Sequence, residues 1–202
     1  MTDSQQIVYV VEDDEAVRDS LEMMLVSMEH NVATFPTANA FLEEYDELMA
    51  GCIVLDIRMP GMDGMELQKA LNTKNSILPI IFVTGHGDVP MAVEAMQQGA
   101  IDFIQKPYRE QELLEKIKAA LELDAEQRAS LIEKKEIQHK LEELTPREQE
   151  IMDMMIDGHA NKVIAIDLDI SQRTVEIHRS RVMHKMGTHS LAHLVRMIMS
   201  VR

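Results

Sequence analysis

The sequence predicts an α/β domain with a five-stranded, doubly wound parallel sheet, followed by a long helix and a small all-helical domain. Three observations support this prediction. Five short apolar runs alternate with helical segments over residues 7–120. Residues 110–143 contain no Gly or Pro and are rich in Glu, Lys, Leu, Ala and Gln, and basic residues gather near the C-terminus. Strands that alternate with helices form parallel sheets covered on both faces.

The five expected strands are the apolar runs of the first 105 residues: IVYVV (7–11), VATF (32–35), CIVL (52–55), PIIFV (79–83) and AIDFI (100–104). The segments between them are long enough to hold helices. In such a sheet, ligands bind beyond the carboxyl ends of the strands. The residues that follow each run are therefore the candidates for chemistry.

Charge is distributed unevenly along the chain. Residues 1–120 hold 21 Asp and Glu against 8 Lys and Arg, a net charge of -13, whereas residues 171–202 hold one acid and six bases, a net charge of +5. This asymmetry indicates two domains with different partners. Hydrophobic residues make up 46% of the chain and charged residues 27%, which is typical of a folded globular protein and excludes general disorder.

Targeting and redox signals are few. The N-terminus lacks the basic start and the length of a signal peptide, and no apolar stretch approaches the roughly 20 residues that span a bilayer. Cys52 is the one cysteine, which excludes an internal disulfide and suits a reducing compartment. We therefore expect a cytoplasmic protein.

Polar side chains follow four of the apolar runs. Glu12 and Asp13 follow the first run, Asp56 the third, Thr84 the fourth and Lys106 the fifth. Taken singly, each has an ordinary explanation, such as a turn at Asp56, a helix cap at Thr84 or a solvated loop at Lys106. Taken together at one sheet edge, they predict a site.

The expected cluster of acids requires a positive partner. Two like charges about 4 Å apart repel by about 4 kcal/mol at an effective dielectric constant near 20. Oxygen ligands without His or Cys select a hard cation, and carboxylates that leave room for water and a phosphoryl oxygen suit Mg²⁺. Asp56 is then a nucleophile that accepts a phosphoryl group, with Thr84 and Lys106 contacting the product.

Three segments, VVEDDEAVR, LDIRMPGMDG and VTGHGDVPMAVEAMQQGAIDFIQKP, resemble the receiver domain of two-component response regulators, and the third resembles the FixJ-type branch. The resemblance implies a flavodoxin-like receiver over residues 1–121, phosphorylated by a sensor histidine kinase, with a cis Lys106–Pro107 bond. It assigns these roles: Asp56 as phosphoacceptor, Glu12, Asp13, Asp56 and the Arg58 backbone carbonyl as Mg²⁺ ligands, Thr84 and Phe103 as switch residues, and Lys106 as phosphate contact. Glu12 departs from the commoner Asp, so a mild change in Mg²⁺ affinity is expected.

Residues 122–142 are predicted to form a helical linker. The apolar positions of this helix break around Asp124 to Arg128, and no heptad repeat is sustained. A solvated, semi-rigid linker is therefore favoured over a continuous coiled coil.

Residues 143–202 are predicted to fold as a separate helical domain. Thr145, Pro146 and Glu148 form a capping box at the start of a helix. Further on, a short helix reaches Leu168, a turn follows at Asp169, and Ser171 caps a helix whose apolar face comprises Val175, Val182 and Met186. This order of helix, turn and helix is typical of DNA-binding proteins.

The segments LTPRE, NKVIA, SQRTVEIH and HKM resemble the LuxR-type DNA-binding domain, a four-helix helix-turn-helix fold. The resemblance implies that the helix from about Arg173 enters the major groove of double-stranded operator DNA. It implies DNA contacts by Lys162, Arg173, Thr174, Glu176, Ile177, His178, Arg179, Ser180 and Lys185, of which Lys162 and Lys185 contact the DNA backbone. Asp169 replaces the usual Gly of the turn, and Glu176 stands where relatives often have Lys, so base preference is open.

The predicted function is that of a response regulator rather than a turnover enzyme. Phosphorylation of Asp56 would change the surface formed by helix 88–98, strand 101–105 and the helix from 110, and so promote a homodimer that binds DNA and contacts RNA polymerase. Two rival interpretations are a haloacid-dehalogenase-like phosphatase, which usually needs a DxD pair after the first strand, and a regulator that binds no DNA, against which the basic residues 171–202 argue.

Overall fold

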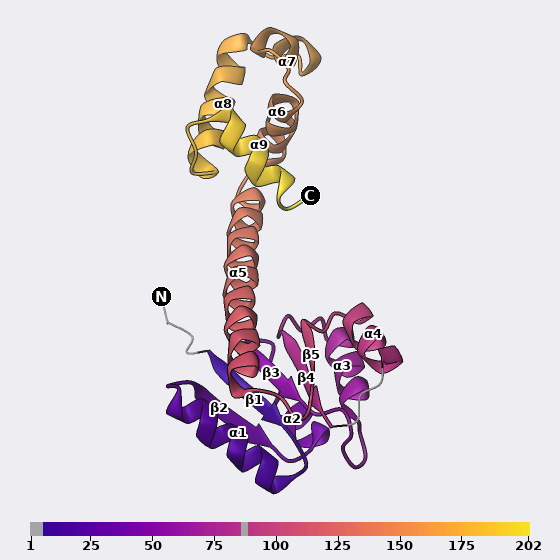
Figure 1. Ribbon diagram of the computed structural model, residues 1–202. Helices are drawn as coiled ribbons and strands as arrows, with labels where there is room; N and C mark the ends of the chain where they lie inside the picture. The colour runs from indigo at the N-terminus through magenta and orange to yellow at the C-terminus, as the bar shows by residue number, and fades with distance from the viewer. Residues whose placement is uncertain (1–5, 86–88) are drawn as a thin grey trace. The chain divides into compact units, whose positions relative to one another are not determined.

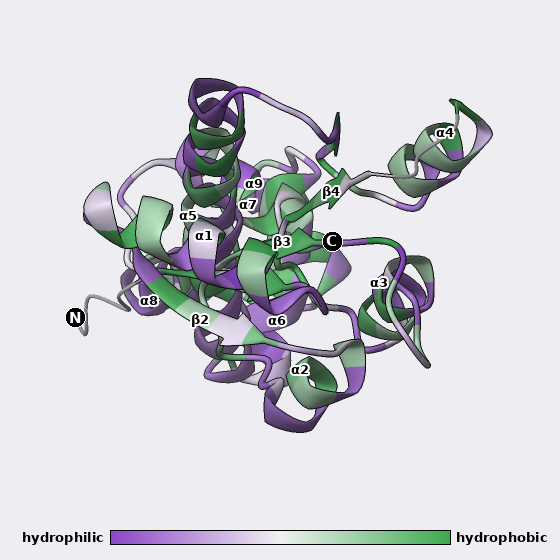
Figure 2. Ribbon diagram, turned by 60° about the horizontal axis from the view of Figure 1, so that its bottom comes forward, coloured by the Kyte–Doolittle hydropathy of each residue, from purple (hydrophilic) through white to green (hydrophobic). Residues whose placement is uncertain are grey.

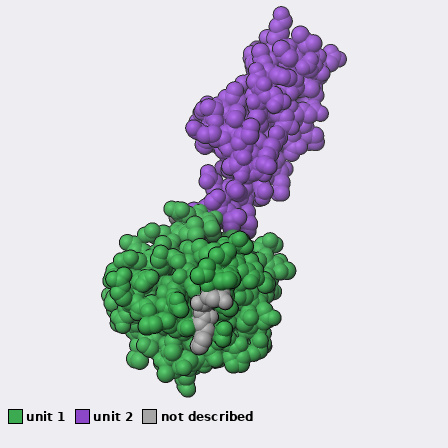
Figure 3. All heavy atoms as spheres, turned by 45° about the vertical axis from the view of Figure 1, so that its right-hand side comes forward, with its two compact units in different colours: residues 1–128 green, residues 129–202 purple. Residues whose placement is uncertain are grey.

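The computed structural model describes residues 6–85 and 89–202, and the chain divides into two compact units, residues 1–128 and 129–202 (Figure 3). Helix α5, Glu110–Glu142, continues across the boundary between the units. The boundary falls within residues 122–142, the segment predicted to be a linker. Each unit has its own hydrophobic core.

The first unit is built on a five-stranded sheet in the order β2-β1-β3-β4-β5, in which all neighbouring strands are parallel. The predicted doubly wound α/β fold is confirmed. The strands are β1 Ile7–Val11, β2 Asn31–Phe35, β3 Gly51–Leu55, β4 Ile80–Thr84 and β5 Asp102–Gln105. The central strands β3 and β4 are buried along their whole length, and Figure 2 shows them in green among the helices.

Two layers of helices cover the sheet (Figure 1). On one face, α1 (Glu15–Ser27) and the first part of α5 pack over Val10, Val54 and Val83. On the other face, α2 (Ala38–Glu44), α3 (Gly64–Thr73) and α4 (Val89–Gln97) pack over the alternate side chains of the same strands. Burial on both faces explains why the inner strands β1, β3 and β4 are nearly continuous apolar runs rather than alternating ones.

The strand register brings the residues that follow the strands to one edge of the sheet. Val11 pairs with Leu55, so Glu12 and Asp56 leave neighbouring strands side by side. The Asp56 N–H donates to the Val11 carbonyl across 2.9 Å, which extends the pairing by one residue.

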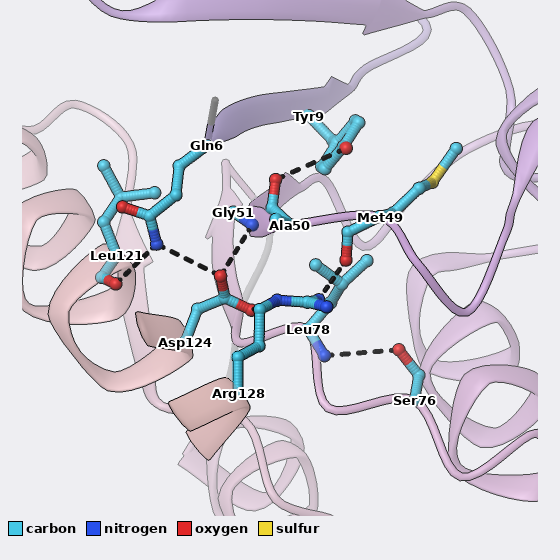
Figure 4. A network of polar contacts seen from close by, with 10 residues as sticks. All are labelled: Gln6, Tyr9, Met49, Ala50, Gly51, Ser76, Leu78, Leu121, Asp124 and Arg128. Atoms are coloured by element: carbon cyan, nitrogen blue, oxygen red, sulfur yellow. Dashed lines mark hydrogen bonds and ion pairs between the residues drawn. The ribbon is translucent and has the colours of Figure 1, made fainter. Parts of the chain in front are cut away.

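Polar contacts hold α5 to the opposite edge of the sheet (Figure 4). Asp124 Oδ2 accepts hydrogen bonds from the Gly51 N–H at 2.9 Å and from Gln6 Nε2 at 3.1 Å. Its Oδ1 accepts from Arg128 Nε at 2.8 Å, and the Arg128 guanidinium also donates to the Met49 carbonyl. Asp124 and Arg128 lie where the apolar pattern of the helix breaks. They bind α5 to the sheet, so the helix is held up to Arg128.

The second unit contains the end of α5 and four further helices: α6 Pro146–Ile156, α7 Asn161–Asp167, α8 Gln172–Lys185 and α9 Leu191–Met199. This confirms the predicted four-helix architecture, with α7 and α8 as the helix-turn-helix. Val175, Val182 and Met186 of the predicted apolar face are fully buried. Within residues 6–85 and 89–202, no helix combines the length and the apolar character needed to cross a bilayer.

Candidate functional site

Three carboxylates converge at the carboxyl edge of the sheet in the first unit. Glu12, Asp13 and Asp56 each place a carboxylate oxygen within 4.8 Å of the other two. Glu12 and Asp56 are only 3% and 8% exposed, whereas Asp13 is exposed to solvent. The structure thus brings together the three acidic side chains that the sequence predicts as a cluster.

Lys106 faces this cluster. Its Nζ donates to Glu12 Oε2 across 2.7 Å and lies 3.9 Å from Asp56 Oδ1, so the ammonium is bonded to Glu12 and only near Asp56. The Lys106–Pro107 bond is cis, as expected. Burial raises the pKa of Glu12 above its ordinary 4.5; the hydrogen bond and the charge of Lys106 oppose this rise, and the charge of Asp56 adds to it.

The cluster fits a hard divalent cation. No hydrogen-bond donor in the described part of the chain reaches the buried Asp56 Oδ1, although a buried carboxylate oxygen is costly to leave without a partner. Three acids face one ammonium here, which leaves negative charge in excess. Carboxylates alone, with one of them open to solvent, suit Mg²⁺ with several retained waters.

Thr84 and Phe103 lie on the two strands beyond β3. Thr84 is the last residue of β4 and is buried, and its carbonyl accepts from the Lys106 N–H across 2.9 Å. Phe103 pairs with Phe82 in the strand register, and the two rings pack at a centroid distance of 6.4 Å. Phe103 is half-buried. Arg58 lies in an exposed loop position two residues after Asp56.

Two residues near the cluster were missed by sequence reasoning. Arg18 of α1 donates through Nη1 to the carbonyls of Glu12, at 2.9 Å, and Asp13, at 3.4 Å, and so holds the backbone of the acidic loop. Gly64 lies so close to the loop after β3 that a Cβ there would be 2.3 Å from the Asp56 carbonyl oxygen. A lone Arg in the acidic first helix was the available signal for Arg18; nothing in the sequence indicated the close approach at Gly64.

The predicted DNA contacts lie mostly on one helix of the second unit. On α8, Arg173, Glu176, Ile177 and Ser180 are exposed, while Thr174, His178 and Arg179 are half-buried. Lys162 is exposed on α7. Because the opposite face of α8 is buried in the core, this helix presents a defined polar face to solvent.

The turn before α8 has the geometry expected for a helix-turn-helix. Asp169 adopts a left-handed φ of 51°, the conformation that a Gly provides most easily. The Ile170 N–H then bonds to the Ala165 carbonyl at 3.0 Å, and Ser171 Oγ caps α8 by accepting from the Thr174 N–H at 3.0 Å.

Lys185 differs from the other predicted DNA contacts. Its Nζ donates to Glu148 Oε2 at 2.6 Å and to the Glu143 carbonyl at 2.9 Å. Glu148 also accepts from the Thr145 N–H, which confirms the predicted capping box of α6. Lys185 is therefore already paired inside the unit, and this pairing weighs against its predicted contact with the DNA backbone.

The fold and the two sites define a class of protein: the regulators that join a signal-receiving α/β domain to a helix-turn-helix domain. The sequence matches the response regulator receiver domain over residues 8–118 and the luxR family of bacterial regulatory proteins over residues 142–198. The chain belongs to the two-component response regulators with a LuxR-type DNA-binding domain. We call the two units the receiver and the reader domain from here on.

The similarity to individual relatives extends over nearly the whole chain. Response regulator protein TodT of Pseudomonas putida is 41% identical over 97% of this chain and 86% of its own length. Transcriptional regulatory protein FixJ of Bradyrhizobium diazoefficiens is 44% identical over 95% of this chain and 94% of its own length. The solved structure of response regulator StyR superposes with a TM-score of 0.88 at 43% identity, covering 96% of this chain and 98% of that one.

Proposed function

We propose that a sensor histidine kinase phosphorylates Asp56 in a Mg²⁺-dependent reaction, and that this modification controls dimerisation and sequence-specific DNA binding. One observation carries the proposal: the buried Asp56 Oδ1, without a hydrogen-bond donor among the described residues, beside Glu12, Asp13 and Lys106. An oxygen in this position is available to a phosphoryl group, and its neighbours supply both metal ligands and a cation.

Each residue of the cluster has a distinct part in the proposed reaction. An Asp56 carboxylate oxygen forms the new bond to phosphorus while the bond from phosphorus to the kinase histidine nitrogen breaks, and the imidazole leaves. Glu12, Asp13, Asp56 and the Arg58 carbonyl would hold Mg²⁺, and the bound ion would supply positive charge to neutralise the transferred oxygens. Lys106 would shift from Glu12 toward the new phosphate. The same groups would later assist hydrolysis of the acyl phosphate.

The switch from phosphorylation to dimerisation is proposed to run through Thr84 and Phe103. The phosphoryl group adds about -1.5 to -2 charge and three acceptor oxygens, which would draw the Thr84 hydroxyl inward. The surface of α4 beside them carries exposed Val89, Val93 and Met96. An apolar helix face at a solvent boundary favours contact with a second copy of the receiver.

Dimerisation would bring two reader domains to one operator. Two linked domains gain affinity through effective concentration, and half-sites one helical turn apart are separated by roughly 34 Å. The exposed face of α8 would read bases in the major groove, while Arg and Lys side chains neutralise phosphates. The DNA-bound dimer would contact RNA polymerase, and the protein would act in the cytoplasm.

The test uses the full chain and an operator selected from random duplex DNA. Wild type and Asp56→Asn are compared with and without acetyl phosphate and Mg²⁺, by intact mass spectrometry and by DNA-binding titration. We expect wild type alone to gain a phosphoryl group and to bind the operator more tightly. Asp19→Asn, an exposed acid of α1, serves as the control and should behave as wild type. Equal DNA affinity in all conditions would refute phosphorylation control.

A further inference from the structure

Helix α4 is weakly held by apolar packing. Of its nine residues, Ala95 is the one whose side chain is buried, whereas Val89, Val93 and Met96 are 77%, 48% and 45% exposed. Met91 adds a partly buried contact with the core. Helices with little buried apolar area are generally among the segments of a fold that open most easily.

The C-terminal end of α4 is held by side chains of α3. Gln68 Nε2 donates to the Ala95 carbonyl across 3.0 Å, and Asn72 Nδ2, one helical turn further along α3, donates to the Gln98 carbonyl across 2.8 Å. The Ala95 carbonyl also accepts the Ala100 N–H across 3.1 Å, so the bond from Gln68 is its second hydrogen bond. Two side-chain amides of α3 therefore bond to carbonyls at the end of α4, and Figure 1 shows the two helices as neighbours.

Gln68 makes one hydrogen bond through its buried side chain in the described part of the chain, from Nε2 to the Ala95 carbonyl. Its side chain is 0% exposed, and its Oε1 meets no hydrogen-bond donor within the described ranges. A buried amide with one unsatisfied atom is costly, so the bond to Ala95 is the interaction that retains it there. The nearby pair of Lys69 and Glu94 is different, because both side chains are more than half exposed.

The other end of α3 is joined to the loop that carries Asp56. The Gly64 N–H donates to the Ile57 carbonyl across 2.8 Å, and Asp63 caps the helix through a capping box with Glu66. Helix α3 therefore contacts the Asp56 loop at its start and, further along, the C-terminal end of α4.

From this arrangement we propose that Gln68 and Asn72 are positioning residues that pin the C-terminal end of α4 to α3. This end becomes the pivot about which α4 changes orientation when Asp56 is phosphorylated. The role of this end as a pivot rests on the proposed function. The hold of Gln68 and Asn72 on α4 concerns the unphosphorylated protein and does not rest on it. Signal-dependent movement is thereby confined to the N-terminal part of α4, whose first residue, Val89, is 77% exposed.

Amide hydrogen exchange of the unphosphorylated full chain tests whether Gln68 and Asn72 hold the C-terminal end of α4 to α3, a contact that we call the pin. Gln68→Met removes the donor at nearly constant volume, and Asn72→Ala removes the second, exposed donor with little risk to folding. We expect exchange over residues 94–100 to become about fivefold faster in each variant, as the loss of one hydrogen bond predicts. Lys69→Ala is the control and should exchange as wild type, since exposed ion pairs contribute little. Unchanged exchange in both Gln68→Met and Asn72→Ala would overturn the pin.

The pivot is tested by adding acetyl phosphate and Mg²⁺. In wild type we expect exchange to change over residues 89–93 and to stay constant over residues 96–100, whereas in Gln68→Met the change should extend to residue 100. Equal changes along all of α4 in wild type would overturn the pivot. No change anywhere in wild type would instead count against phosphorylation of Asp56, and the pin would still be judged by the unphosphorylated variants.

Discussion

Asp124 and Gly51 are 73 positions apart in the sequence, yet the Asp124 carboxylate accepts the Gly51 N–H across 2.9 Å. Asp124 is fully buried, and Gly51 has a φ of 132° and so little room that a Cβ would collide with the Ile7 carbonyl. This contact joins the first half of α5 to the start of β3. It makes residues up to Arg128 part of the receiver.

Loss of the Asp124 carboxylate should destabilise the receiver. Asp124→Asn places an amide N–H₂ among three donors, and it leaves the partly buried Arg128 without its ion-pair partner. Breaking a buried pair on one side costs about 3 kcal/mol, so we expect a loss of that size in the free energy of unfolding. Urea unfolding of the full chain measures it. Glu126→Gln, at an exposed position of the same helix, should change stability by less than about 0.5 kcal/mol; similar losses in both variants would contradict a specific anchor.

Mg²⁺ should stabilise the receiver through the acidic cluster. A cation that binds the folded state alone raises the unfolding temperature with the logarithm of its concentration. In Asp13→Asn one carboxylate of the cluster is lost while its neighbours remain, so the Mg²⁺-dependent rise should shrink strongly. Differential scanning calorimetry of the receiver transition measures this. Asp19→Asn should keep the full response, and an equal response in Asp13→Asn would remove Asp13 from the metal site.

Stability of the reader domain should depend on pH through Glu148. Hydrogen bonds from Lys185 and from the Thr145 backbone lower the pKa of Glu148 from 4.5 to about 2. The unfolded chain therefore binds a proton more readily than the folded one between these values. The stabilisation is complete above pH 4.5 and is lost as the pH falls toward 2.

The variant Glu148→Gln isolates this contribution. Its reader domain should unfold at a lower temperature than wild type at neutral pH, and the difference should narrow as the pH falls below 4.5. Calorimetry across this pH range gives the comparison. Glu150→Gln, on the exposed side of α6, should leave the wild-type pH profile intact. A constant gap between wild type and Glu148→Gln would contradict a lowered pKa.

Arg173 is expected to contact DNA phosphate. Its side chain is exposed at the start of α8. In Arg173→Gln the affinity for duplex DNA should fall, and the slope of log affinity against log salt should decrease by about one. Titrations of labelled DNA at several salt concentrations provide the slope. Arg196→Gln carries the same charge change on α9; if it reduces the slope equally, net charge rather than position explains the effect.

The sequence alone determined the architecture of both domains and most of the acidic site. Continuous apolar runs separated by helical segments favour a parallel sheet covered on both faces, and in such a sheet the polar residues that end the strands meet at one edge. This is why Glu12, Asp56 and Lys106 were predicted together. Local signals were equally sufficient for the caps of Thr145 and Ser171, because capping depends on residues three positions apart.

Only the tertiary structure decided which polar residues serve the fold. Asp124 and Arg128 interrupt an apolar pattern and therefore indicated a solvated linker, yet their partners lie on a sheet edge more than 70 positions away. Lys185 has the charge of a DNA contact but pairs with Glu148, and Gln68 has no sequence signal for its bond to Ala95. A hydrogen bond between distant residues leaves no periodicity in the sequence, because its partner is chosen by three-dimensional packing.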